Sequence, residues 1–126
     1  MKANLTLVGD WATTCRNIKF KHGTERVIMN FEGSKNILGN KDLKKAGPIL
    51  ENSDFPKLKN CILNLANNHF MDHGLQNAKK NINQMKKKKI KYFGFGKNLN
   101  TSRNELILKI KNYKIAIIGC NEPQFG

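Results

Sequence analysis

The chain has 126 residues, a length suited to a single domain. Its 23 lysines and arginines against 9 aspartates and glutamates give a net charge of +14, which favours an anionic partner. Only three of the basic residues are arginines, the side chain that recognises base edges and phosphates best, so the composition argues against nucleic acid. A general bias towards Lys, Asn and Ile explains much of the charge.

Three features of the sequence indicate the cellular compartment. No apolar stretch approaches the length needed to cross a bilayer, and the amino terminus lacks the apolar segment of a secretory leader. The cysteines are odd in number, and two of them, Cys61 and Cys120, lie in apolar runs where a thiol behaves as a small hydrophobe. If Met1 is the true start, these signals predict a cytoplasmic protein in a reducing compartment.

Three apolar segments predict strands that end in polar side chains. The predicted strands are residues 4–8, 26–31 and 61–65. Gly9-Asp10 is expected to end the first strand as a turn, Asn30 and Glu32 follow the second, and Asn68-His69 follow the third. Because open α/β folds keep their sites at the carboxyl ends of their strands, these polar groups are expected to meet at one edge of a sheet.

The remaining elements follow from composition and periodicity. Residues 33–60 are rich in Lys, Asn, Gly and Pro and predict a loop with a short helical turn at 56–59. Residues 75–89 predict a helix with one narrow buried stripe, closed by the tetralysine run 86–89. The stripe consists of Leu75, Ala78, Ile82 and Met85. Residues 90–93 predict a fourth strand, and residues 106–110 with 113–118 predict an antiparallel hairpin.

Three motifs in this order resemble the CapA-like capsule-synthesis family, which includes poly-γ-glutamate biosynthesis proteins. They are Gly9-Asp10, Asn30-Phe31-Glu32-Gly33, and Ala66-Asn67-Asn68-His69 with Asp72 and Gly74 behind it. Residues 94–99 and 114–119 also look like this family. The resemblance implies a metallophosphoesterase-like αββα sandwich, an α/β fold, spanning residues 1–126 as a single domain.

The resemblance also implies a site for divalent metal ions, whether Mn, Mg, Fe or Zn. The residues expected at the metal are Asp10, Asn30, Glu32 and Asn68, with Asn30 orienting Glu32. His69 would contact the scissile phosphate or protonate its leaving group, and Asp72 would hold an imidazole tautomer.

Each of these residues also has a simpler interpretation. Asp10 would merely cap the following segment, and Asn30 and Glu32 would be ordinary turn residues. Asn67 and Asn68 would supply only turn amides. His22 is expected to be solvated, and His73 is expected at the surface or at a helix start, without a ligand role.

The chain departs from the family pattern in one respect. Members carry a second half with a Gly-His-x-x-His segment, whereas the only histidines here are His22, His69 and His73. The expectation is therefore a domain incomplete at its C-terminus, in which mainly the first sheet and its helices are present. Such a chain would bind metal weakly and hydrolyse little alone, unless a separate chain supplies the missing half.

Three functions compete at this point. The first is a CapA-like metallophosphoesterase relative that acts in capsule or cell-envelope polymer biosynthesis, on an anionic polymer or a phosphorylated precursor. The second is a basic module that docks an anionic polymer through residues 86–91 and Lys44-Lys45. The third is a fragment without function.

Overall fold

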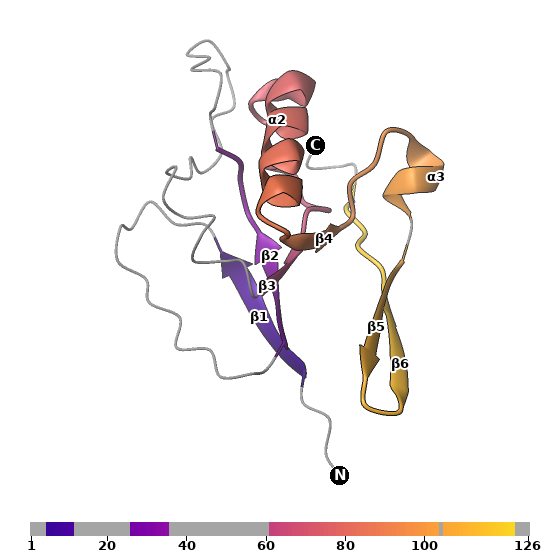
Figure 1. Cartoon of the computed structure of the whole chain (residues 1–126). Coiled ribbons are helices and arrows are strands. Elements are labelled where there is room, and N and C mark those ends of the chain that lie inside the picture. Colours follow the sequence, from indigo (N-terminus) through magenta and orange to yellow (C-terminus); the bar gives the residue numbers. More distant parts are fainter. Residues whose placement is uncertain (1–4, 12–25, 36–60, 104, 123–126) are drawn as a thin grey trace, which may run out of the picture.

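The computed structural model describes residues 5–11, 26–35, 61–103 and 105–122 (Figure 1). Its elements are β1 (Leu5–Trp11), β2 (Arg26–Phe31), β3 (Cys61–Asn64), α2 (Gly74–Lys87), β4 (Lys91–Phe93), α3 (Leu99–Ser102), β5 (Leu106–Ile110) and β6 (Tyr113–Ile117). The first four strands form a parallel sheet in the order β1-β2-β3-β4, and β5 and β6 form an antiparallel hairpin. The predicted α/β class and the predicted hairpin are confirmed. The helical turn expected at 56–59 lies outside the described residues.

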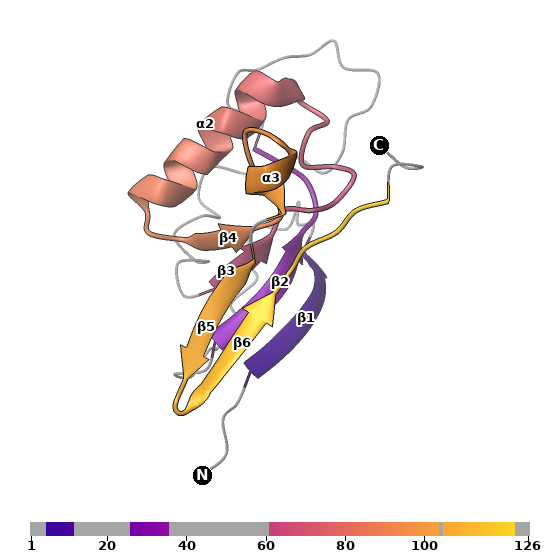
Figure 2. The same ribbon diagram turned by 90° about the vertical axis from the view of Figure 1, so that its right-hand side faces the viewer.

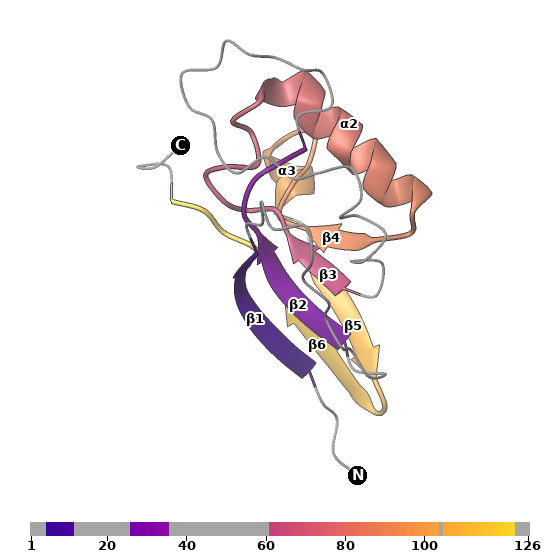
Figure 3. The same ribbon diagram turned by 90° about the vertical axis from the view of Figure 1, so that its left-hand side faces the viewer.

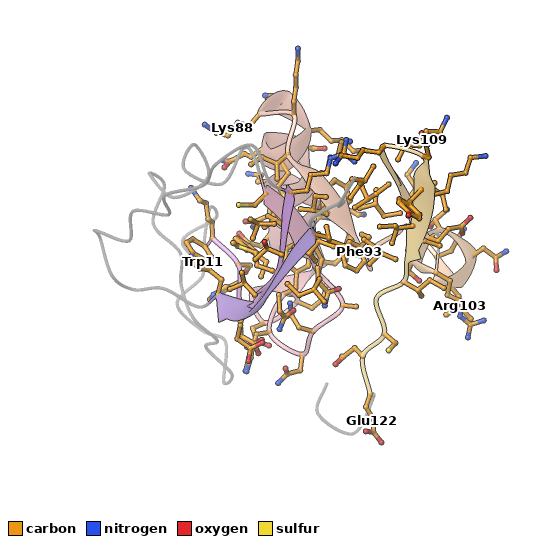
Figure 4. The ribbon with its side chains drawn as sticks, turned by 90° about the horizontal axis from the view of Figure 1, so that it is seen from below. Trp11, Lys88, Phe93, Arg103, Lys109 and Glu122 are labelled. Carbon is orange, nitrogen blue, oxygen red and sulfur yellow. The ribbon has the colours of Figure 1, made fainter. Side chains whose placement is uncertain are left out.

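The parallel sheet is covered on both faces. The hairpin of β5 and β6 lies in front of the sheet in Figure 2 and behind it in Figure 3. On this face the core consists of Ile28, Ile62, Phe93 and Leu108. On the opposite face, alternate residues of β2 and β3 pack with α2, and this core consists of Trp11, Val27, Met29, Phe31, Cys61, Leu63, Leu65, Phe70, Ala78, Ile82, Met85 and Ile90. Figure 4 shows Phe93 towards the hairpin and Trp11 on the other side.

Two sheets therefore face each other, where the sequence indicated mainly one. Successive residues of a strand point to opposite faces, so β2 and β3 contribute apolar side chains to both cores. Both strands are almost continuously apolar for this reason. A tight turn after Ile110 joins β5 to β6, and Lys111 in this turn adopts the left-handed region (φ 54°).

A β-bulge interrupts β1. The first residues of β1 pair one to one with β2, but Gly9 then falls outside the ladder, so that Asp10 pairs with Asn30 and Trp11 with Phe31. The rings of Trp11 and Phe31 stack at 5.7 Å between centroids. The prediction that the strand stops at Gly9 was wrong, because the bulge absorbs the glycine and the strand continues to Trp11.

The buried stripe of α2 is partly polar. Ala78, Ile82 and Met85 are buried as predicted, but Leu75 is 49% exposed and the stripe includes Asn77 and Asn81 instead. Hydrophobic periodicity assigned Leu75 rather than the two asparagines to the buried face, because asparagine is polar. Their amides bind Ser34 and Lys35, which makes their burial possible.

Two of the cysteines, Cys61 and Cys120, lie in the described part of the chain. Cys61 is buried, and burial raises the pKa of its thiol. Cys120 is exposed, so the expectation that its thiol behaves as a small hydrophobe was wrong. Cys15 lies outside the described residues. None of the helices in the ranges given above has both the length and the apolar character needed to span a bilayer.

Candidate functional site

A row of polar side chains crosses the parallel sheet at the carboxyl ends of its strands. Asp10 of β1 pairs with Asn30 of β2, and Asn30 pairs with Asn64 of β3. Ile28 and Ile62 belong to the core under the hairpin, so Asn30 and Asn64, two residues further along, point to the same face. The bulge in β1 is what brings Asp10 into this row.

The amide of Asn30 lies at the centre of the row. Its Nδ2 donates hydrogen bonds to Asp10 Oδ1 at 2.7 Å and to Glu32 Oε2 at 2.5 Å. Its Oδ1 accepts hydrogen bonds from Asn64 Nδ2 at 3.2 Å and from Asn67 Nδ2 at 3.3 Å. One neutral side chain therefore holds two carboxylates on one side and two amides on the other.

The turn after β3 is fixed by Asn67. Its Oδ1 accepts hydrogen bonds from the backbone N–H groups of His69 at 3.0 Å and Phe70 at 2.8 Å. Its Nδ2 also donates to the backbone oxygen of Phe31 at 2.8 Å, which ties the turn to the end of β2. The interpretation of Asn67 as a turn residue is thus confirmed, although the side chain does more than shape the turn.

The imidazole of His69 lies between two neighbours of its own turn. Asn68 Nδ2 is 3.2 Å from His69 Nε2, and Asp72 Oδ2 is 2.8 Å from His69 Nδ1. Because the amide nitrogen can only donate, Nε2 is the acceptor and Nδ1–H donates to Asp72. The contact expected of Asp72 is present, and the imidazole remains 35% exposed while the carboxylate is 9% exposed.

One contact joins this turn to the carboxylates. His69 Nε2 lies 3.8 Å from Glu32 Oε1. The structure thereby connects Asp10, Glu32, Asn68 and His69 in one network drawn from the ends of three strands. Their convergence agrees with the expectation from the sequence, and their roles at a metal or a substrate stay predictions.

The electrostatics of this network are set by the proximity of two negative charges. The pKa of Glu32 is raised above its usual value, mainly by burial and next by the negative charge of Asp10. The neighbouring His69 and the hydrogen bond from Asn30 lower the pKa of Glu32, but by less. Two carboxylates held close together with little positive charge between them are an arrangement that a cation would stabilise.

Comparison with known proteins identifies the family. A family model described as bacterial capsule synthesis protein PGA_cap matches residues 51–125. The chain belongs to the PGA_cap family. No curated protein and no solved structure matches the chain. The matched stretch contains Asn68, His69 and Asp72. The carboxylates of β1 and the end of β2 lie before the matched stretch.

The donors of this PGA_cap protein suit a hard divalent ion. Asp10 and Glu32 supply carboxylate oxygens, and Asn68 carries an amide oxygen, which are ligands of the kind that Mg²⁺ and Mn²⁺ prefer. Within residues 5–11, 26–35, 61–103 and 105–122, no three His, Cys, Asp or Glu side chains are grouped as a metal site. In the described part of the chain, an ion would therefore depend on amide or water oxygens in addition to the two carboxylates.

Two buried side chains, His73 and Trp11, carry ring nitrogens without hydrogen-bond partners in the described part of the chain. His73 occupies the helix start, as one interpretation expected, but it is only 3% exposed rather than at the surface. In the described region neither of its ring nitrogens has a hydrogen-bond partner, and the same holds for Trp11 Nε1. His22, Lys44 and Lys45 lie outside the described residues.

Sequence reasoning also missed Asn64 as part of the network. The signal was present, because Asn64 follows Ile62 by two residues and so shares its face of the strand. Its register with Asn30 depends on how the strands pair, which a single sequence does not give.

Proposed function

We propose that this PGA_cap protein carries a divalent-metal-dependent phosphoesterase-like site of the metallophosphoesterase type, used in the synthesis of a capsular or envelope polymer. The substrate class is an anionic polymer or a phosphorylated precursor of one. The observation that carries the proposal is the network that joins Asp10 and Glu32 to His69 across three strand ends.

The carboxylates provide the binding part of the mechanism. Asp10 and Glu32 would hold the ion with their oxygens, and Asn68 would contribute its amide oxygen. A divalent ion supplies positive charge that polarises a phosphate oxygen. With two carboxylates and one amide available among the described residues, we expect weak metal binding and slow hydrolysis by this chain on its own.

His69 provides the proton-transferring part. Its ring is 35% exposed, so a phosphate ester can reach it, and its Nδ1–H is held by Asp72. Asp72 would orient the ring through Nδ1–H, and Nε2 would be the nitrogen that gives a proton to the leaving oxygen. The carboxylate of Glu32 lies 3.8 Å from Nε2, which places this nitrogen next to the proposed metal ligands.

Metal dependence and turnover test this proposal together. We expect the full chain to bind Mn²⁺ in titration calorimetry and to hydrolyse an aryl phosphate diester slowly, with loss of activity on addition of chelator. Asp10→Ala is expected to weaken Mn²⁺ binding by about tenfold or more, since it removes one of two carboxylates. His69→Gln is expected to keep Mn²⁺ affinity and to lower turnover by about 100-fold.

The exposed carboxylate Glu105, which lies outside the network, provides the matched control. Glu105→Ala should leave both binding and turnover as in the wild type. Equal Mn²⁺ affinity in Asp10→Ala and Glu105→Ala would refute the assignment of the metal site, and full turnover in His69→Gln would refute the role of the imidazole.

Binding of an anionic polymer is a second candidate function, favoured by one observation. Lysines 86–89 and Lys91 are all exposed where α2 ends and β4 begins, and Lys88 points away from the molecule in Figure 4. A helix of 14 residues spans about 21 Å, so this surface is separate from the turn that precedes α2. A lysine-rich helix terminus is also an ordinary solvated end that complements the helix dipole.

Salt dependence separates the two functions. If the lysines dock a polymer, poly-γ-glutamate binding should fall steeply between 50 and 200 mM salt, roughly in proportion to the charges neutralised, and should be insensitive to chelator. Replacing Lys86, Lys87 and Lys88 by glutamine should then abolish binding while Lys79→Gln, Lys80→Gln on the middle of α2 should weaken it less. Binding that is unchanged in the triple variant would rule out this surface.

A further inference from the structure

We propose that Asn64 and Asn67 are positioning residues that act through Asn30 to hold the carboxylates of Asp10 and Glu32 side by side. The arrangement is a relay of three amides that begins at backbone N–H groups and ends at the two carboxylates. Its effect on metal binding rests on the proposed function, whereas its geometry does not.

The relay begins with backbone groups that can only donate. The N–H of Ala66 donates to Asn64 Oδ1 at 3.1 Å, and the N–H groups of His69 and Phe70 donate to Asn67 Oδ1. A backbone N–H fixes which end of an amide faces it, because only the oxygen accepts. Both Asn64 and Asn67 must therefore turn their nitrogens the other way.

The nitrogens of these two amides meet at a single acceptor. Asn64 Nδ2 and Asn67 Nδ2 both approach Asn30 Oδ1, at 3.2 and 3.3 Å. Two donors on this side of Asn30 fix its orientation in turn, so its own nitrogen faces Asp10 and Glu32. With its oxygen engaged by two amides, Asn30 orients the carboxylates through its N–H groups rather than offering an oxygen beside them.

The choice of an amide at this position has an electrostatic consequence. Each N–H of Asn30 serves one carboxylate, so the two negative groups are held at a defined spacing. A lysine or arginine in the same place would hold them equally well but would cancel their charge. The relay thus restrains the pair while leaving both charges for an incoming cation, which is the pre-organisation that ion binding requires.

A purely structural alternative makes a different prediction. Asn64 and Asn67 would then serve only the turn after β3, by accepting the N–H groups of Ala66, His69 and Phe70. Aspartate at either position keeps that acceptor but cannot donate to Asn30. Asn64→Asp therefore preserves the turn contact and removes the link to Asn30, whereas Asn67→Asp also removes the hydrogen bond to the backbone oxygen of Phe31.

Nuclear magnetic resonance of the side-chain amides tests the relay without any metal. The cross-peaks of Asn30 in the ¹⁵N-labelled full chain are identified by their loss in Asn30→Ala. We expect both of its amide protons to be shifted downfield, one of them to move in Asp10→Ala and the other in Glu32→Ala. Asn64→Asp should move the Asn30 cross-peaks as well, whereas Asn83→Asp, on the exposed face of α2, should not. Asn30 cross-peaks at the position of a solvated amide, or unmoved by Asn64→Asp, would overturn the proposal.

A double-mutant cycle tests the consequence for the ion. Asn64→Ala is expected to weaken Mn²⁺ binding by about tenfold, the size of effect typical of residues that orient metal ligands. In an Asn30→Ala background the same change should alter the affinity less than about twofold, because the link is already cut. Independent effects of the two substitutions would contradict the relay. If the wild-type chain binds no Mn²⁺, the proposed function fails, and the spectra alone decide whether the relay exists.

Discussion

Replacing Asn81 by leucine is expected to destabilise the fold by about 2–4 kcal/mol, although it extends the apolar stripe of α2. Asn81 is fully buried and accepts from the backbone N–H of Lys35 at 3.0 Å while it donates to the oxygens of Lys35 at 2.9 Å and of Asn77 at 2.9 Å. Leucine removes these partners and leaves buried backbone groups with poorer pairing. Urea unfolding followed by circular dichroism measures the change.

The control for this substitution lies two residues further along α2. Asn83 is exposed, so Asn83→Leu should change the free energy of unfolding by less than about 0.5 kcal/mol. Equal urea midpoints for the two leucine variants would show that the amide of Asn81 does not attach α2 to the segment after β2. The contrast isolates the buried amide, because the residue replaced, the residue introduced and the helix are the same.

Gly94→Ala is expected to cost about 2–4 kcal/mol, because the substitution combines backbone strain with a collision. Gly94 has φ +81°, a region that residues with a Cβ rarely adopt, and a Cβ there would lie 2.7 Å from both the Cβ and the backbone nitrogen of Ala66. Relief requires Ala66 to move, and its N–H is the one that orients Asn64. The variant should therefore lose Mn²⁺ affinity as well as stability.

Substitutions at two other glycines distinguish the cost of backbone strain from the cost of the steric collision with Ala66. Gly74, at φ +80° with nothing within 4 Å of a Cβ, carries the strain alone, so Gly74→Ala should cost about 1–2 kcal/mol. Gly9 has neither a positive φ nor a neighbour within 4 Å, and Gly9→Ala should be close to neutral. Thermal unfolding of the three variants should rank them in this order. A Gly94→Ala variant as stable as Gly74→Ala would show that Ala66 moves aside at no cost.

Strand positions were the most predictable part of the fold. The segments at β2 and β3 and in the hairpin were recognised because apolar runs and turn residues are local features. The bulge at Gly9 was not, since it depends on how β1 pairs with β2. The short helix α3 was missed although Asn98 and Thr101 form a capping box, a local signal that a four-residue helix makes easy to overlook.

The convergence of the candidate residues was predictable, but the hydrogen bonds between them were not. Asp10, Glu32, Asn68 and His69 were expected together because parallel strands bring their carboxyl ends to one edge. The hydrogen bonds that hold the two carboxylates come from Asn30, and Asn30 is held in turn by Asn64, whose contribution depends on strand register and amide orientation. Polar residues inside the helix stripe escaped notice for the same reason, because their partners lie more than 40 residues away in the chain.

The extra residue in β1 gives one strand two phases of alternation. Before Gly9 the even-numbered residues of β1 point towards α2, and after Gly9 the odd-numbered residues do. Trp11 therefore packs in the core beneath α2, and Asp10 points to the hairpin side. If Gly9 were instead paired with Asn30, Asp10 would fall opposite Phe31 and the two side chains would exchange faces, placing an acidic group in the hydrophobic interior and the indole outside it. An alignment of relatives that treats this strand as gap-free would therefore superimpose outward-facing side chains on inward-facing ones wherever the glycine has no counterpart.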